Sequence, residues 1–139
     1  MIAAVCTWHE HHVAAVTQIE QRLDRGERLK VPAPALAESY AVLTRLPSPH
    51  RLSPSDAWAL VETNFILRAG VVGLNGIGYA KLLGRLAKTE VSGGRTYDAV
   101  IAECAKRSRA SVLLTFNRHH FGPPLDTVTV IDPSAPSRI

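Results

Sequence analysis

Apolar and polar positions along this chain recur at helical spacing, in segments that short apolar runs separate. The first such segment predicts a helix from 8 to about 25. A short strand begins near 29 and stops at two prolines, and a second helix follows, with Leu36, Tyr40 and Leu43 on its buried stripe. Helices that alternate with strands indicate the α/β class.

The middle of the chain continues this alternation. A turn-rich connector at 47–54 contains Ser53, which is a suitable N-cap for a helix through 57–66. An apolar run at 69–74 predicts a short buried strand, and a helix from about 76 to 88 follows. The residues of this helix that are predicted to point inward are Tyr79, Leu82, Leu83 and Leu86.

A glycine pair followed by an acidic first turn predicts the start of another helix. Gly93 and Gly94 allow a tight turn, and Thr96 can cap the helix. Asp98, in the first turn, is favoured by the helix dipole. The helix is expected to run to about Arg109, with a buried stripe made of Tyr97, Ile101, Cys104 and Ala105.

Oxygen-bearing side chains occur where these elements begin or end. The apolar run 111–116 predicts a parallel strand covered on both faces, and Asn117 follows it at the strand end where α/β sheets bind ligands. Glu38 is rotated by roughly 200° from Leu36 on its helix, so it can face a surface other than the core. Carboxylate and carbonyl oxygens suit Mg²⁺ or Mn²⁺, so Glu38, Asp98 and Asn117 are the candidate catalytic and metal-binding residues.

Each of these residues has a simpler interpretation when it is considered alone. Glu38 is typical of a solvated helix carboxylate, Asp98 of an acid that satisfies the helix dipole, and Asn117 of a turn former. It is their combined order along the chain, and none of the three residues alone, that favours a shared site.

Other chemistries find less support. His9, His11 and His12 invite a zinc interpretation, but no Cys or further His stands at ligand spacing. Ser39 and Ser92 lack the glycine elbow of a serine hydrolase, and the glycines do not form a phosphate-binding loop. Metal-assisted hydrolysis is the chemistry that remains.

Five ordered segments resemble a PIN-domain ribonuclease of the VapC toxin type. They are Trp8–His12, Pro34–Tyr40, Gly94–Ala99, Leu114–Phe121 and Val130–Pro133. The resemblance extends over nearly the whole chain and implies a three-layer α/β/α fold with a mostly parallel central sheet.

The resemblance also implies an activity. Proteins of this family are similar in being small, metal-dependent endoribonucleases that prefer single strands and are neutralised by an antitoxin, here of the VapB type. It implies Mg²⁺ or Mn²⁺ as cofactor, a homodimer, and Glu38, Asp98 and Asn117 in the second, third and fourth positions of the metal site. The candidate RNA contacts are Arg95, Arg118, His119 and His120.

The family pattern is incomplete at one position. PIN domains open with a strand that ends in an Asp, and Met1–Val5 would correspond to the residues immediately after that Asp. The first strand is therefore expected to be absent or truncated in this sequence. The alternative hypothesis is a catalytically impaired PIN-fold module that binds an antitoxin or RNA.

Bulk properties agree with this interpretation. The 139 residues suit one domain, expected at 1–133, with a disordered tail at 134–139. A net charge of +4 favours a polyanionic partner, although such an excess is also common on ordinary domains. Cys6 and Cys104 form no disulfide framework, and there is neither a membrane-spanning stretch nor a secretory signal. We therefore expect a cytoplasmic protein without a membrane partner.

Overall fold

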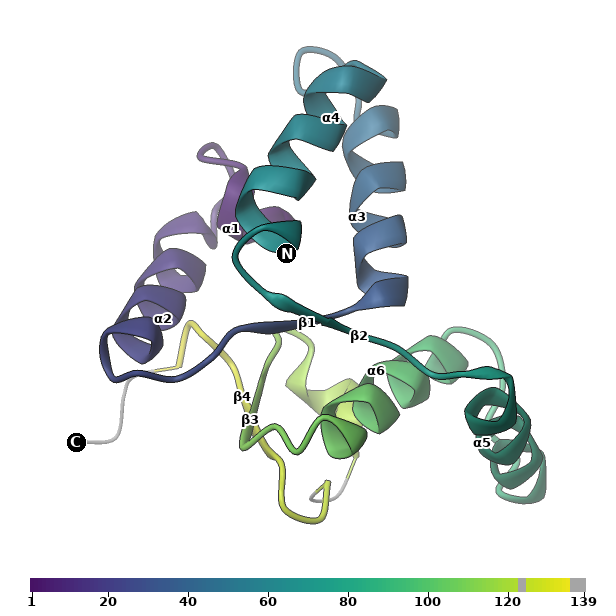
Figure 1. Cartoon of the computed structure of the whole chain (residues 1–139). Coiled ribbons are helices and arrows are strands. Elements are labelled where there is room, and N and C mark those ends of the chain that lie inside the picture. The colour runs from purple at the N-terminus through teal and green to yellow at the C-terminus, as the bar shows by residue number, and fades with distance from the viewer. Residues whose placement is uncertain (123–124, 136–139) are drawn as a thin grey trace. The chain divides into compact units, whose positions relative to one another are not determined.

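The computed structural model describes residues 1–122 and 125–135 (Figure 1). The chain divides into two compact units, the N-terminal unit Met1–Val71 and the C-terminal unit Val72–Ile139.

The N-terminal unit is mainly helical. Its elements are α1 (Ile2–Val5), α2 (His12–Asp24), β1 (Lys30–Pro32), α3 (Ala33–Arg45), α4 (Pro54–Val61), a π-helical turn η1 (Glu62–Ile66) and β2 (Gly70–Val72), whose last residue is the first of the C-terminal unit. The strands β1 and β2 pair with each other, and the Gly70 N–H donates to the Leu29 carbonyl. The Ser53 hydroxyl accepts the Asp56 N–H at 3.1 Å, so the predicted cap of α4 is confirmed.

The core of the N-terminal unit lies between α1, α3 and α4. Cys6, Leu43, Ala57 and Val61 are buried together there, and α3 and α4 pack side by side (Figure 1). Burial raises the pKa of the Cys6 thiol, so this cysteine stays protonated near neutral pH.

Two predictions for this unit are wrong. Tyr40 is 38% exposed, because the buried stripe of α3 runs through Ser39 and Leu43 and Tyr40 is turned 100° away from Ser39. The helix predicted from 8 begins only at His12. The ring nitrogen Nδ1 of His9 accepts the His11 N–H at 3.1 Å, so a side chain satisfies backbone in a turn instead of a helix.

The C-terminal unit combines two long helices with two parallel strands. Its elements are α5 (Gly76–Lys88), α6 (Arg95–Arg107), β3 (Val112–Leu114), a 3₁₀ turn η2 (Arg118–Phe121) and β4 (Thr129–Ile131). β3 and β4 are parallel, with Leu113 opposite Val130. Asn75 caps α5 by accepting the Gly78 N–H at 2.8 Å, and the bounds of α5 agree with the prediction.

The core of the C-terminal unit lies between α5 and α6, where Leu82, Leu86, Val100 and Cys104 are buried together. Their spacing by four residues on each helix defines the two faces that meet. Burial raises the pKa of the Cys104 thiol as well.

Two predictions of burial and one of helix capping are wrong in the C-terminal unit. Leu83 is 48% exposed, because it is turned 100° from Leu82. Tyr97 is 71% exposed, since it lies one turn before Val100, at the start of the helix. Gly94, not Thr96, is the N-cap of α6, because the Thr96 N–H already bonds the Gly93 carbonyl inside the first turn.

The strands are also shorter and less covered than predicted. The strand predicted at 69–74 is formed at Gly70–Val72, and Val71 is 46% exposed. All three residues of β3 are half-buried, so this strand is not covered on both faces.

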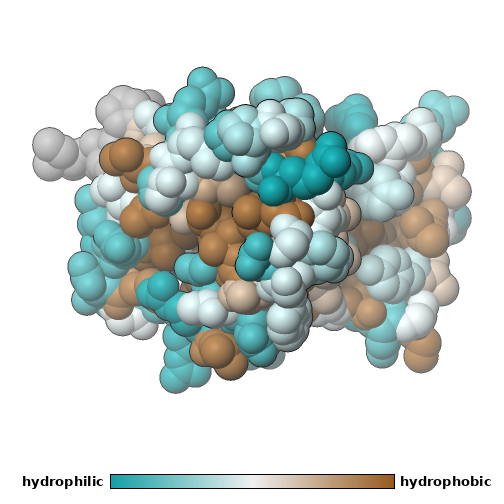
Figure 2. Space-filling model, turned by 90° about the horizontal axis from the view of Figure 1, so that it is seen from above, coloured by the Kyte–Doolittle hydropathy of each residue, from teal (hydrophilic) through white to brown (hydrophobic). Residues whose placement is uncertain are grey.

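Apolar side chains reach the surface in both units. Figure 2 shows hydrophobic residues among hydrophilic ones on the face that it presents. None of the described helices is long and apolar enough to cross a membrane.

The tail predicted at 134–139 is described only in part. The Ser134 N–H donates to the Asp132 carboxylate at 2.8 Å in a turn, and 136–139 lie outside the described residues.

Candidate active site

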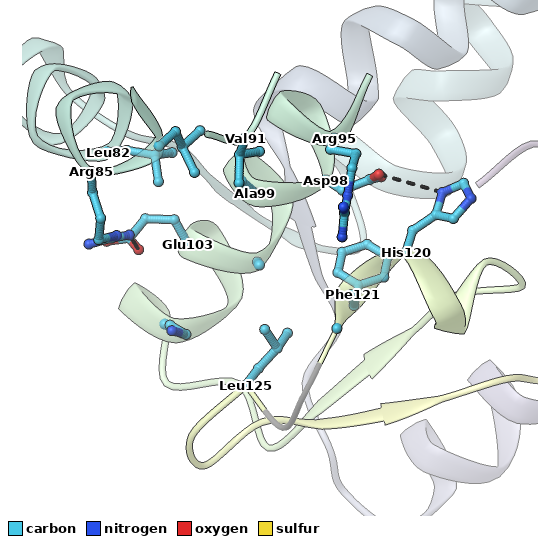
Figure 3. Close-up of a pocket in the computed structure, with 14 residues that line it drawn as sticks. Leu82, Arg85, Val91, Arg95, Asp98, Ala99, Glu103, His120, Phe121 and Leu125 are labelled. Atoms are coloured by element: carbon cyan, nitrogen blue, oxygen red, sulfur yellow. Dashed lines mark hydrogen bonds and ion pairs between the residues drawn. The ribbon is translucent and has the colours of Figure 1, made fainter. Parts of the chain in front are cut away.

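The start of α6 and the turn η2 bring a carboxylate and an imidazole together. Oδ2 of Asp98 lies 3.5 Å from Nδ1 of His120, and their side chains are 27% and 45% exposed (Figure 3). The Asn117 carbonyl accepts the His120 N–H at 2.9 Å, which closes the turn after β3 and directs His120 toward α6. This is the only ion pair of Asp98 among the described residues, so most of its oxygen lone pairs stay available.

Asp98 and His120 line a pocket of about 210 Å³ between α5, α6 and η2 (Figure 3). Its apolar lining is Leu82, Leu86, Val91, Ala99, Ala102, Phe121 and Leu125. Its charged lining is Arg85, Arg95, Asp98, Glu103, Lys106 and His120. The pocket therefore has a hydrophobic wall beside groups of both charges.

Glu103 joins the two long helices at the edge of this pocket. Its carboxylate accepts hydrogen bonds from Arg85 at 2.9 Å and from Arg107 at 3.0 Å. Burial alone would raise the pKa of Glu103, but the hydrogen bonds from Arg107 and Arg85 and their positive charge hold it below its ordinary value. Arg107 also packs tightly over Gly78, where an added Cβ would lie 3.1 Å from its Nη1.

The cations around the pocket differ in their partners. Arg85 is paired with Glu103, and Lys106 with Asp126 at 3.1 Å. Arg95 has no ion pair within the described part of the chain. Arg95 is therefore the basic group that an anionic ligand meets without displacing a carboxylate.

Asn117 is placed where the sequence predicts it, after the end of a parallel strand. It follows β3 by three residues, is exposed, and donates its N–H to the Thr115 hydroxyl at 3.1 Å. η2, which begins directly after it, packs against α6. Asn117 thus directly precedes the turn that contacts the helix of Asp98.

Glu38 is exposed on α3 in the N-terminal unit. Within that unit its charge acts on the α-amino group of Met1, whose pKa is lowered by burial and raised in part by Glu38. Since Asp98 and Asn117 belong to the C-terminal unit, the convergence of the three residues on one cleft stays a prediction.

The four candidate RNA contacts divide into two groups. Arg95 and His120 line the pocket, whereas Arg118 and His119 are exposed on η2 outside its lining. No three His, Cys, Asp or Glu side chains gather into a metal-binding group within the described ranges.

The histidines of the N-terminal unit make local contacts. Nδ1 of His12 lies 2.8 Å from the Ala3 carbonyl, and the rings of Trp8 and His50 stack at 4.1 Å. The first contact ties α2 to α1, and the second joins the segment before α2 to the segment between α3 and α4.

Sequence reasoning missed the pocket itself. Arg85, Phe121 and Glu103 come from three separate elements, and only the acid–base spacing of Glu103 and Arg107, four residues apart, marked a helical ion pair. Neither Arg85 nor Phe121 carries a local signal of its position.

Comparison with known proteins places the chain in a family. A family model for the PIN domain matches residues 1–121. The chain is 40% identical over 113 residues to Ribonuclease VapC40 of Mycobacterium tuberculosis, in strains CDC 1551 and H37Rv, which covers 81% of this chain and 78% of the relative. It is 36% identical over 110 residues to Ribonuclease VapC27 of strain H37Rv, which covers 79% and 67%. No solved structure matches it significantly.

The chain thus belongs to the PIN-domain family, and its relatives are of the VapC type. Its α/β fold is the fold of that family. The expected resemblance and fold class are confirmed, and the single domain at 1–133 stays a prediction.

The donor chemistry fits a hard divalent cation. Asp98 offers carboxylate oxygens at the edge of the pocket, and Asn117 offers an amide oxygen beside the turn that contacts α6. Oxygen donors of this kind are those that Mg²⁺ and Mn²⁺ prefer.

Proposed function

We propose that this protein is a metal-dependent endoribonuclease toxin that cleaves RNA phosphodiesters and is neutralised by a VapB-type antitoxin. The observation that carries the proposal is the position of Asp98, a partly exposed carboxylate at the edge of a pocket. The relatives named ribonucleases support the same reaction class.

Glu38, Asp98 and Asn117 would hold Mg²⁺ or Mn²⁺ through oxygen atoms. The chemistry that such an ion supplies, when bound, is polarisation of the phosphodiester and activation of a water molecule. His120 orients the Asp98 carboxylate through its contact at 3.5 Å and keeps one oxygen turned toward η2.

Four basic residues supply the attraction for RNA in this proposal. They are Arg95, Arg118, His119 and His120, and all are exposed on or beside α6 and η2. Arg95 is the one at the pocket that has no carboxylate partner among the described residues, so it can hold a phosphate next to Asp98. We also propose a homodimer acting in the cytoplasm, without a membrane partner.

The substitution Asp98→Asn tests the proposal. It removes a ligand charge and keeps the shape of the side chain, so cleavage of single-stranded RNA in Mg²⁺ should fall by at least about 100-fold. Circular dichroism should be unchanged. Glu90→Gln, which removes an exposed carboxylate outside the pocket, is the matched control and should keep full activity.

Two results would contradict the proposal. One is undiminished cleavage by the Asp98→Asn protein, and the other is cleavage by the unaltered protein in excess EDTA. An unaltered protein that binds antitoxin or RNA but cleaves nothing in Mg²⁺ or Mn²⁺ would favour the impaired binding module instead.

A further inference from the structure

The pocket between α5, α6 and η2 is larger than coordination of an ion by Asp98 requires. Its volume is about 210 Å³, and seven of its lining residues are apolar. Ligand pockets that bury whole drug-sized molecules span about 300–1,000 Å³, so this one suits a single flat ring system.

We propose that this pocket binds one nucleobase of the RNA substrate, stacked on Phe121 and held at its edge by Arg85. The inference rests on the proposed function and names the subsite that selects the base beside the cleaved bond. The ligand class is a base with an exocyclic carbonyl, such as uracil or guanine.

The wall of the pocket supplies the stacking surface. Phe121 ends η2 and faces the pocket together with Ala99 and Leu125 (Figure 3). Single-stranded RNA is recognised by stacking its bases on aromatic rings, and small or aliphatic neighbours leave room for the ring to enter.

The polar edge of the pocket is fixed in advance. Nη2 of Arg85 donates a hydrogen bond to the Glu103 carboxylate at 2.9 Å, and the same carboxylate accepts a hydrogen bond from Arg107. The Arg85 side chain is 57% exposed, and its guanidinium retains N–H donors beyond the one given to Glu103. A guanidinium held in this way donates to carbonyl oxygens of a base, which adenine lacks.

The charge arrangement favours RNA over an acidic or apolar peptide. Arg95 stands at the same pocket without a carboxylate partner in the described residues, where a phosphate attached to the bound base can lie. Asp98 borders the pocket too, so a base held there places its own phosphodiester beside the proposed reacting centre. The base pocket and the metal-binding carboxylate are therefore continuous.

Direct binding tests the inference without cleavage. In EDTA, labelled single-stranded oligouridine should bind the full chain more tightly than oligoadenosine, as measured by fluorescence anisotropy. Phe121→Leu should weaken oligouridine binding about tenfold, because it removes the aromatic face and keeps an apolar side chain. Phe121→Trp should restore it. Tyr97→Leu removes an exposed aromatic ring on α6, outside the pocket, and should change nothing.

Arg85→Lys is a second variant that keeps the charge but loses the planar fork. It should abolish the preference for oligouridine over oligoadenosine while Phe121 remains in place. Because Arg85 is an exposed helix residue, this variant keeps the test valid even where Phe121→Leu lowers stability.

Mapping of cleavage sites on a random RNA pool separates this inference from the proposed function. Phe121→Leu should change which base precedes or follows the cut, whereas Asp98→Asn should lower the rate at every site alike. Loss of all cleavage by Asp98→Asn with no change in base profile or RNA binding by Phe121→Leu would overturn the inference and leave the proposed function standing. A normal rate in Asp98→Asn combined with altered RNA binding in Phe121→Leu would do the reverse.

A protein ligand is the competing occupant. If Phe121→Leu weakened binding of the antitoxin and left binding of both oligonucleotides unchanged, the pocket would be a protein-docking site and the inference would be wrong.

Discussion

The two units of this protein resemble each other in their cores and differ in charge. Each core is built from packed helices, around Leu43 in the N-terminal unit and Leu82 in the C-terminal unit. The N-terminal unit has seven Lys and Arg against seven Asp and Glu, whereas the C-terminal unit has nine against five. The whole net charge of +4 therefore belongs to the unit that carries the pocket.

This difference shows that similar packing can support unlike surfaces. Burial of apolar side chains depends on area and shape and takes no account of the charges outside the core. The basic excess is consequently free to gather on the unit where we propose that RNA binds. Three further predictions test how far the two units are separate in stability and in charge.

The largest expected effect comes from emptying each core. Leu43→Ala and Leu82→Ala should each lower the free energy of unfolding by about 2–5 kcal/mol, because both side chains are almost fully buried and leave a cavity. Hydrogen exchange followed by mass spectrometry should show faster exchange in α3 and α4 for Leu43→Ala, and in α5 and α6 for Leu82→Ala.

Exposed leucines provide the controls for this comparison. Leu67→Ala and Leu83→Ala change side chains that are 74% and 48% exposed and should alter the free energy of unfolding by less than about 0.5 kcal/mol. Equal acceleration of exchange in all four helices by either core variant would show that the two units unfold as one.

A smaller effect is expected at the ion pair that joins α5 and α6. Glu103→Gln should lower the free energy of unfolding by about 1–2 kcal/mol at neutral pH, because two charge-assisted hydrogen bonds to partly exposed arginines are weakened. The pKa of Glu103 is held below its ordinary value, so its contribution is present above the ordinary Glu pKa and is lost as the pH falls through the pKa of the folded state.

Thermal unfolding at a series of pH values measures this contribution. The difference between Glu103→Gln and the unaltered protein should be full at neutral pH and shrink in acid. Asp126→Asn, which breaks an exposed pair with Lys106, should cost less at every pH. A constant Glu103→Gln difference down to strongly acidic pH would show that the lost packing, and not the charge, is responsible.

The smallest effect concerns the charge difference itself. Arg95→Gln should weaken binding of single-stranded RNA severalfold and make the slope of log affinity against log salt shallower by about 0.7. Arg25→Gln, an exposed change in the neutral unit, should alter neither. Equal effects of the two substitutions would mean that RNA contacts both units alike.

Elements with strong local signals could be predicted from the sequence. The helix Gly76–Lys88 has a capping Asn before it and a clear apolar period. Ser53 caps α4 because it directly precedes that helix in the sequence, so its hydroxyl lies close to the first backbone N–H groups. Asn117 after a strand and Asp98 in a first turn are likewise local placements.

Burial at the edge of a helical stripe could not be predicted. Three residues fit the apolar period of their helices and are nevertheless exposed: Tyr40, Leu83 and Tyr97. The packed neighbours cover only part of the apolar face of each helix. Periodicity gives the direction of a face but not its width, which the packed partner decides.

By itself the sequence determined the α/β class, the bounds of α5, and the order of Glu38, Asp98 and Asn117. These depend on dihedral preference, capping and spacing, which act over a few residues. Only the tertiary structure decided that Arg85, Glu103 and Phe121 share a pocket, since they come from three elements far apart in the chain. Their meeting depends on how α5, α6 and η2 bury their apolar faces together, and that is a property of packing over long sequence separations.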